Sequence, residues 1–303
     1  MTATRRADGS TKALLSTSPS VDVIVVNWNG GASVASAVKS AVRFGGRAIV
    51  VDNGSIDGSI DALRGEPGVV IMEMGWNAGF ARACNAGAGS SEGDYIFLLN
   101  PDAEIVLGRP NDIVEAFQAF PDAGIVGPQI IDSEGESEPS VRRFPTVIDV
   151  LLYQIKLHRW ARRIPPLRRY FMIGFDDSKP AYVDQVIGAA MVVRRSDWEA
   201  IGGMDDGFFL LFEDVDFCKR LADQGLRGVH WPALVVRHVG HESFRRIGHL
   251  RLQRLWNRSL MRYAWKHLGV GGTVLIALTI PLSLVLSLML DIGRLPLVGR
   301  SAR

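Results

Sequence analysis

Four apolar runs in the first third of the chain are each followed by polar residues, and segments rich in small residues separate the runs. The runs are Val21–Val26, Arg47–Val51, Val69–Met72 and Tyr95–Leu99, and the polar residues after them are Asn27, Asp52, Asn77 and Asn100. Strands alternating with helices at this spacing predict an α/β fold with a mostly parallel sheet and helices on both faces. Because ligands bind such sheets at the carboxyl ends of the strands, these polar residues are the first candidates for function.

The regular pattern stops at about Asp132 and resumes near residue 181. Tyr182–Arg194 is predicted to be one apolar strand that contains Gly188 and Ala189. Gly228–Arg237 is predicted to be another strand, and an acidic helix start lies between the two. The second half is therefore also predicted to contain strands and a helix.

The run Leu268–Leu290 carries no charge and is long enough for one transmembrane helix. A buried core helix and a helical hairpin that only dips into the bilayer are the alternatives. The segment before it, Arg245–Lys266, is basic, which by the positive-inside tendency predicts a main domain on the cytoplasmic side. Val147–Arg163 also mixes cationic and apolar residues, which predicts a helix on an anionic membrane surface or an ordinary solvated helix face.

Composition narrows the function classes. The 303 residues suffice for one large or two small domains, and the net charge of +2 argues against a nucleic-acid binder. Cys84 and Cys218 form no CxxC motif or disulfide framework, which fits a reducing cytoplasm. The polar first twenty residues lack the apolar core of a signal peptide, so they are predicted to be a disordered leader.

Asn100-Pro101-Asp102 follows an apolar strand, and in an extended segment the side chains at its two ends point the same way. Their oxygens suit a hard cation such as Mg²⁺ or Mn²⁺, although the tripeptide is equally a good turn sequence. Asp52 is expected either to cap a turn or to contact a nucleobase or ribose. The chain has no G-x-G-x-x-G or Walker A motif, so phosphates would be held by a metal and scattered donors.

The stretch from Phe208 to Leu221 carries three acids at a helix start. Helical spacing places Glu213 and Asp216 on one face, whereas Asp214 lies with the apolar residues and should point inward under the aromatic run. Partial burial would raise the pKa of Asp214 towards the range of a general base. The alternative is an acid that only stabilises the helix N-terminus.

Two histidines, His238 and His241, follow the last predicted strand. A single histidine is usually structural. Two of them three residues apart, downstream of a possible metal carboxylate, make a metal-ligand role worth testing.

These motifs together resemble an inverting family 2 glycosyltransferase with the GT-A fold, and especially the bacterial rhamnosyltransferase-like branch. The resemblance runs from about Val21 to Ser243 and is specific because the motifs come in one order. They are V-V-N-W-N-G, V-D-N-G-S-x-D-G-S, N-A-G-F-A-x-A-C-N-A-G, L-L-N-P-D, a G-A-A-M strand, F-E-D-V-D-F-C-x-R and H-x-G. The usual Asp-x-Asp motif is Asn-x-Asp here, which puts Asn100 in doubt as a direct metal ligand.

The resemblance implies a role for each matching position. Asp214 matches the catalytic base, with Glu213 and Asp216 as supporting acids, and Asp102 and His238 match the metal side of the site. The positions implied to bind the nucleotide-sugar are Asn27, Asp52, Asn77, Gly79, Asn100, Gly188 and Ala189.

The resemblance implies an enzyme of the cell membrane that transfers a sugar from a nucleotide-sugar donor to a lipid-linked or glycan acceptor, using Mg²⁺ or Mn²⁺ and no nucleic acid. The branch suggests dTDP-rhamnose as donor, with UDP- and GDP-sugars open. A nucleotidyltransferase and a non-catalytic nucleotide-sugar-binding scaffold are the rivals; the first needs an early Gly-rich phosphate loop that is missing, and the second would be expected to lose Asp102 or Asp214.

The predicted organisation has a core domain with flanking segments. Residues 1–20 form the leader, 21–131 the nucleotide-binding half, 132–180 a basic insertion on the membrane and acceptor side, 181–243 the catalytic half, 244–267 a basic amphipathic segment, 268–290 the membrane segment and 291–303 a tail.

Overall fold

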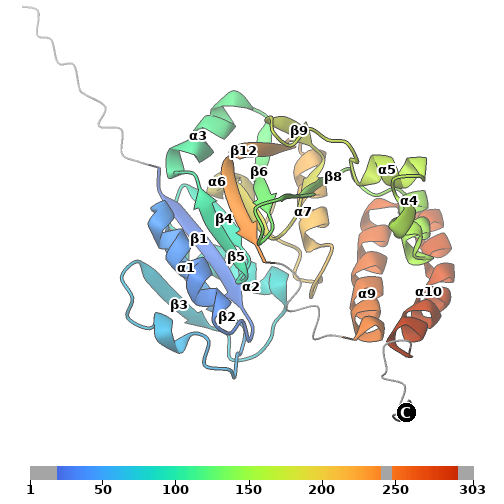
Figure 1. Cartoon of the computed structure of the whole chain (residues 1–303), viewed down its shortest axis with the longest axis horizontal. Helices are drawn as coiled ribbons and strands as arrows, with labels where there is room; N and C mark the ends of the chain where they lie inside the picture. The colour runs from blue at the N-terminus through green and yellow to red at the C-terminus, as the bar shows by residue number, and fades with distance from the viewer. Residues whose placement is uncertain (1–18, 240–247, 293–303) are drawn as a thin grey trace, which may run out of the picture.

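The computed structural model describes residues 19–239 and 248–292 (Figure 1). His241, Arg245, Arg246, nearly all of the leader and most of the tail lie outside the described residues. A ten-stranded sheet has the order β3-β2-β1-β4-β11-β6-β12-β5, with β7 beside β6 and β9 beside β12. The strands are β1 Val21–Asn27, β2 Arg47–Asp52, β3 Val69–Glu73, β4 Tyr95–Leu99, β5 Ala103–Leu107, β6 Ala123–Ile131, β7 Ser137–Glu138, β9 Ala181–Val183, β11 Ala190–Arg194 and β12 Arg227–His238. The four predicted early strands are confirmed.

Helices cover both faces of the sheet, as the strand pattern predicted. Alternate residues of β1 face opposite sides, since Val23 packs in one core cluster with α1 and α3, while Ile24 packs in the other with α2 and α7. β1 is buried along its whole length, which explains its continuous apolar run. The helices are α1 Ser33–Phe44, α2 Phe80–Gly89, α3 Pro110–Ala119, α6 Arg195–Ala200 and α7 Glu213–Asp223, with one 3₁₀ turn η1 Asp61–Leu63.

Strand direction brings distant segments to one edge of the sheet. β1 is parallel to β2 and β4, and β12 is parallel to β6, whereas β11 is antiparallel to both β4 and β6. The carboxyl ends of β1, β2, β4 and β12 and the amino end of β11 therefore share an edge. This carboxyl edge holds the polar residues that the sequence pointed to.

The prediction of one strand over Tyr182–Arg194 is wrong. The segment divides into β9, which pairs with β12, then β10 Gln185–Val186, which pairs with β8 Val141–Arg142 in a separate two-stranded ribbon, and then β11. Each piece has a different partner, so the chain must turn between them. Gly188 and Ala189 consequently lie in a loop.

Four helices gather beside the sheet domain, at the right of Figure 1, and form the helical unit. They are α4 Val147–Gln154, α5 Pro165–Tyr170, α9 His249–His267 and α10 Gly269–Ile292, with a 3₁₀ turn, η2 Leu157–Trp160, between the first two. The expected single helix over Val147–Arg163 is wrong, because Lys156 adopts a left-handed φ of +64° and ends the first helix.

The helix α10 buries polar side chains and exposes apolar ones, the reverse of a helix in a soluble protein. Its buried positions include Thr273, Ser283 and Ser287, whereas its exposed positions are apolar. Ser283 accepts a hydrogen bond from Asn257 of α9 at 3.1 Å, and Ser287 donates to Gln253 at 3.2 Å. The exposed apolar face consists of Val270, Val274, Leu275, Leu278, Leu282, Val285, Leu288 and Met289. Among the described residues, this one helix, over Gly269–Asp291, is long and apolar enough to cross a membrane.

Candidate active site

The ends of β1 and β2 are joined by a hydrogen-bonded network around the buried side chain of Asn27. Its Nδ2 lies 2.9 Å from Oδ1 of Asp52, 3.0 Å from the hydroxyl of Ser55 and 2.8 Å from that of Ser59. Oδ2 of Asp52 accepts the backbone N–H of Ser55 at 2.9 Å. The network fixes the loops at the carboxyl edge, and a contact of the buried Asp52 with a base or ribose stays a prediction.

The loop after β3 packs onto the loop that precedes α7. Asn77 accepts the backbone N–H of Gly79 at 3.0 Å, and Asn53, just after β2, donates to the Gly79 carbonyl at 3.2 Å. Gly79 has φ +90°, and a Cβ there would lie 2.6 Å from the carbonyl oxygen of Phe209. That carbonyl accepts the N–H of Phe80 at 2.8 Å. Glycine is therefore required at position 79 by both conformation and close approach.

Asn100-Pro101-Asp102 forms a turn, because the N–H of Ala103 donates to the Asn100 carbonyl at 3.1 Å. The prediction that Asn100 and Asp102 point the same way from an extended segment therefore rests on a wrong backbone conformation. Nε2 of His238, at the end of β12, lies 3.2 Å from Oδ1 of Asp102. The two predicted metal-side residues thus lie together, although they are far apart in the sequence.

The Asp102–His238 pair fits a metal that takes few protein ligands. Within the described residues, no group of three or more His, Cys, Asp or Glu side chains could enclose an ion. Mg²⁺ and Mn²⁺ sites in nucleotide enzymes commonly use one or two carboxylates and complete their shell with phosphates and water. A carboxylate with an imidazole beside it suits such a site, with Mn²⁺ accepting the nitrogen more readily than Mg²⁺.

The loop of Gly188 and Ala189 forms hydrogen bonds with both the end of β4 and the start of α7. The carbonyl of Ala189 accepts the N–H of Asn100 at 2.9 Å, and the N–H of Gly188 donates to Oδ2 of Asp214 at 2.9 Å. A Cβ at position 188 would lie 3.4 Å from the Asp214 side chain. This loop therefore ties the proposed base to the strand end that carries Asp102.

Asp214 and Glu213 begin α7 in different surroundings. Asp214 is half-buried, and its Oδ1 accepts the N–H of Val215 at 2.8 Å. Burial raises the pKa of Asp214, and the backbone N–H groups of Gly188 and Val215, with the charge of Arg142, oppose that rise. Glu213 is buried away from solvent with its Oε2 unpartnered, and burial, reinforced by the Asp214 charge, raises its pKa to about 8.

Asp216, expected as a supporting acid, points towards α9. Its fully buried carboxylate lies 2.8 Å from His267, 2.5 Å from Lys266 and 2.8 Å from Arg220. Burial acts to raise the pKa of Asp216, but the hydrogen bonds from these three side chains outweigh it and lower the pKa. Asp216 therefore attaches the helical unit to α7.

A cavity of about 120 Å³ lies between Asp214 and the helical unit. Arg142 lines it, although the sequence presents this residue only as one of many arginines in a basic stretch. No local signal marks it, because its position depends on the pairing of β8 with β10. Its other lining residues are Pro145, Asp149, Val150, Tyr153, Tyr170, Gln185, Ile187, Leu211, Phe212, Val215 and Trp256.

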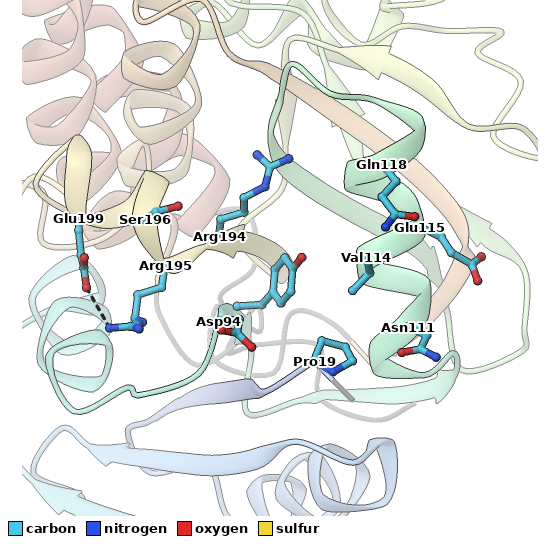
Figure 2. Close-up of a pocket in the computed structure, with 11 residues that line it drawn as sticks. Pro19, Asp94, Asn111, Val114, Glu115, Gln118, Arg194, Arg195, Ser196 and Glu199 are labelled. Atoms are coloured by element: carbon cyan, nitrogen blue, oxygen red, sulfur yellow. Dashed lines mark hydrogen bonds and ion pairs between the residues drawn. The ribbon is translucent and has the colours of Figure 1, made fainter. Parts of the chain in front are cut away.

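A larger cavity, about 790 Å³, lies at the opposite edge of the sheet, where β4 begins and β11 ends (Figure 2). Several of its charged residues have partners within the chain: Arg195 pairs with Glu199 at 3.4 Å, and the Arg194 guanidinium lies 4.1 Å above the ring of Phe117. None of the predicted site residues lines this cavity. The predicted site residues therefore lie at the carboxyl edge and not at this cavity.

Comparison with known proteins agrees with this geometry. The family model described as "Glycosyl transferase family 2" matches residues 22–198. An N-acetylglucosaminyl-diphospho-decaprenol L-rhamnosyltransferase of Mycobacterium tuberculosis is 31% identical over 210 residues, which cover 65% of this chain and 68% of that protein. The rhamnosyltransferase WbbL of Escherichia coli is 27% identical over 167 residues, covering 51% and 56%.

A solved structure shares the fold. The mannosyltransferase PcManGT from Pyrobaculum calidifontis, in complex with GDP-Man and Mn²⁺, superposes with a TM-score of 0.55 and 18% identity, over 93% of this chain and 77% of that one. The expected GT-A architecture is confirmed. The family match ends at residue 198, before α7 and His238, so the roles of Asp214 and His238 stay predictions.

Proposed function

The chain belongs to glycosyl transferase family 2 and is a glycosyltransferase, and on that premise we propose that it inverts the transferred sugar with Asp214 as general base. One observation carries the proposal: the Gly188–Ala189 loop bonds to both Asn100 and Asp214. A carboxylate base beside the strand end that would hold a diphosphate is what a single displacement needs.

In the proposed reaction, Asp214 accepts the proton of an acceptor hydroxyl while the hydroxyl oxygen bonds to the anomeric carbon of the donor. The bond from that carbon to the diphosphate oxygen breaks on the opposite face, so the configuration inverts. Burial raises the pKa of Asp214, which strengthens it as a base. The N–H groups of Gly188 and Val215 hold its two oxygens in place and favour the ionised carboxylate, which opposes the effect of burial on its pKa.

Asp102, with His238 beside it, would hold the divalent cation. Such a cation, Mg²⁺ or Mn²⁺, neutralises charge on the departing diphosphate when it is bound. The neutral Asn100 side chain has one amide oxygen to offer to the donor. The Mn²⁺ in the PcManGT structure supports the presence of a divalent cation in this fold.

The proposed donor is a nucleotide-activated rhamnose, with dTDP-rhamnose the first to test. Two relatives carry the name rhamnosyltransferase, which supports this choice over other sugars. Trp28 and Trp76, in the loops after β1 and β3, are 44% and 57% exposed, so each offers an aromatic face near Asp52 to a nucleobase.

The proposed acceptor is a sugar carried on a membrane lipid, and the polarity of α10 supports a membrane location. A helix that turns serines inward and leucines outward is suited to lipid and not to water. The helix α9 forms a hairpin with α10 and exposes Arg251, Arg254 and Arg258. If α10 crossed the bilayer perpendicular to its plane, these arginines would be drawn into hydrocarbon. We therefore propose that α10 embeds its apolar face from the cytoplasmic side instead of crossing the bilayer.

Donor hydrolysis tests the proposal directly. The purified chain would be incubated with dTDP-rhamnose and with UDP- and GDP-sugars, with Mg²⁺, with Mn²⁺ and with a chelator. Release of free sugar from one donor, dependent on metal, is expected. No release or transfer from any donor would contradict the assignment, while release that a chelator does not change would contradict the metal.

A further inference from the structure

Arg142 is placed next to the proposed base by a small β-ribbon. It lies on β8 directly opposite Gln185 of β10, three residues before Gly188, whose N–H binds Asp214. The N–H of Ile187 donates to the carbonyl of Ser140 at 3.0 Å, which closes the ribbon next to the loop. The same ribbon therefore fixes the backbone of Arg142 and the orientation of the base.

The guanidinium of Arg142 has unused hydrogen-bonding capacity. Its Nε is hidden from solvent and has no hydrogen-bond partner. Among the described residues, no carboxylate forms an ion pair with Arg142, and the guanidinium carbon lies 5.3 Å from the ring centre of Phe171. Its charge nevertheless acts on Asp214 across the cavity that both residues line. Arg142 as a whole is half-buried, but a guanidinium N–H that is hidden from solvent and lacks an acceptor is costly, which suggests that a ligand supplies the acceptor.

The cavity walls favour an amphiphilic ligand. Apart from Arg142, the charged side chains are Asp214 and Asp149, and Oδ2 of Asp149 is already paired with Arg169 at 2.5 Å. The aromatic rings of Tyr153 and Trp256 stack at 5.1 Å on the side of the helical unit. The cavity holds about 120 Å³, which is room for a few waters or one phosphate-sized group and not for a whole glycan.

The same helix connects the cavity to the apolar surface. Val150 and Tyr153 of α4 line the cavity, while Ile148 of the same helix is 53% exposed and α4 packs against α10. A ligand with a phosphate at Arg142 could extend an apolar chain along α4 towards the exposed face of α10. A soluble glycan would gain nothing from that route.

We propose that Arg142 binds a phosphate of the acceptor, so that the site takes a glycosyl phosphate or diphosphate carried on a lipid chain. This inference rests on the proposed function and assigns the acceptor's anion to Arg142. A guanidinium can donate two parallel hydrogen bonds to a phosphate and is the usual residue for that task. The phosphate at Arg142 would hold the sugar so that its hydroxyl reaches Asp214.

The test compares two acceptors that carry the same sugar on the same alkyl chain, one joined through a diphosphate and one through a neutral ether. Arg142→Gln should raise the KM for the diphosphate acceptor roughly 10- to 100-fold, the usual value of hydrogen bonds to a charged group. The KM for the ether acceptor should stay within about twofold, since the ether offers no anion to Arg142. Arg142→Lys should recover part of the loss because it keeps the charge.

Arg143→Gln is the matched control, because Arg143 is the next residue and pairs with Asp184 at 3.1 Å outside the cavity. Equal losses on both acceptors, or no loss on either, would overturn the proposal. Absence of donor hydrolysis in the wild-type chain would instead overturn the proposed function.

If Arg142→Gln fails to fold, the wild-type chain answers the question. Farnesyl diphosphate, with metal in excess, should inhibit competitively against the diphosphate acceptor and not against the donor, and farnesol should inhibit at least tenfold more weakly. Equal inhibition by the two compounds would reject a phosphate site, and competition against the donor would place the phosphate at Asp102.

Discussion

The backbone N–H of Gly188 donates a hydrogen bond to Oδ2 of Asp214 across 2.9 Å, and the N–H of Val215 donates to Oδ1 at 2.8 Å. Both oxygens of the carboxylate are thus oriented by backbone groups. Lone pairs remain on each oxygen for an acceptor hydroxyl. The geometry of the base therefore depends on a loop that also bonds to Asn100.

Asp214→Asn should abolish transfer while leaving donor binding intact. An amide cannot accept the hydroxyl proton, so kcat should fall about 10²- to 10⁴-fold, the usual contribution of a general base. Rates with radiolabelled donor and donor affinity by calorimetry measure the two effects. Asp223→Asn, at the other end of α7, is the control; full activity in Asp214→Asn would remove the base from this position.

Asp102→Asn should weaken the response to metal more than His238→Gln does. Loss of the carboxylate removes the charge that a hard cation requires, so the Mn²⁺ concentration for half-maximal activity should rise about tenfold or more. Titration of activity with Mn²⁺ and Mg²⁺ measures this shift. Asp94→Asn, just before β4 at the opposite edge of the sheet, should leave the titration unchanged, and an unchanged curve in Asp102→Asn would argue against a metal at this pair.

Gly79→Ala should destabilise the fold and the donor site together. The new Cβ would meet the Phe209 carbonyl at 2.6 Å in a backbone with φ +90°. We expect a loss of more than about 2 kcal/mol in unfolding free energy, measured with urea, against about 1 kcal/mol for Gly75→Ala. Gly75 has φ +75° and open space around it, so the control carries the backbone strain without the clash.

Glu213→Gln should change the pH dependence of stability. Burial raises the pKa of Glu213 in the folded chain to about 8, above the ordinary 4.5. The folded state therefore holds a proton that the unfolded state releases, and the wild-type chain loses stability as pH rises from about 4.5 to about 8. Glutamine cannot ionise, so the melting temperature of the Glu213→Gln variant, relative to that of wild type, should increase between pH 5 and 8.5. A constant difference across that range would show that Glu213 titrates normally.

Leu278→Glu should weaken membrane binding. Leu278 is 72% exposed in the apolar face of α10. A carboxylate at this position is costly to transfer into lipid, so the helix would bind the membrane less tightly. Binding to vesicles with anionic lipid should fall roughly tenfold in a flotation assay. Leu107→Glu is the control, since Leu107 is also exposed and apolar but lies on β5 in the sheet domain. Equal binding by both variants would exclude α10 as the contact.

The sequence by itself determined the early strands, the start of α7 and the inventory of polar residues at strand ends, because hydrophobic periodicity and turn residues are local signals. It also predicted the apolar helix at the C-terminal end. These features follow from the composition of short segments, so no distant contact was needed to find them.

Only the tertiary structure decided how deeply each acid of α7 is buried. Helical spacing predicted Asp214 as the inward acid, but Glu213 and Asp216 are the buried ones and Asp214 stays half-buried at the cavity. Spacing does not say which partner a face will meet, and α9 supplies the Lys266 and His267 side chains that hold Asp216. The splitting of Tyr182–Arg194 and the placement of Arg142 beside Asp214 likewise depend on pairings between segments over forty residues apart in the chain. Such contacts form only when the whole sheet assembles, and no local pattern encodes them.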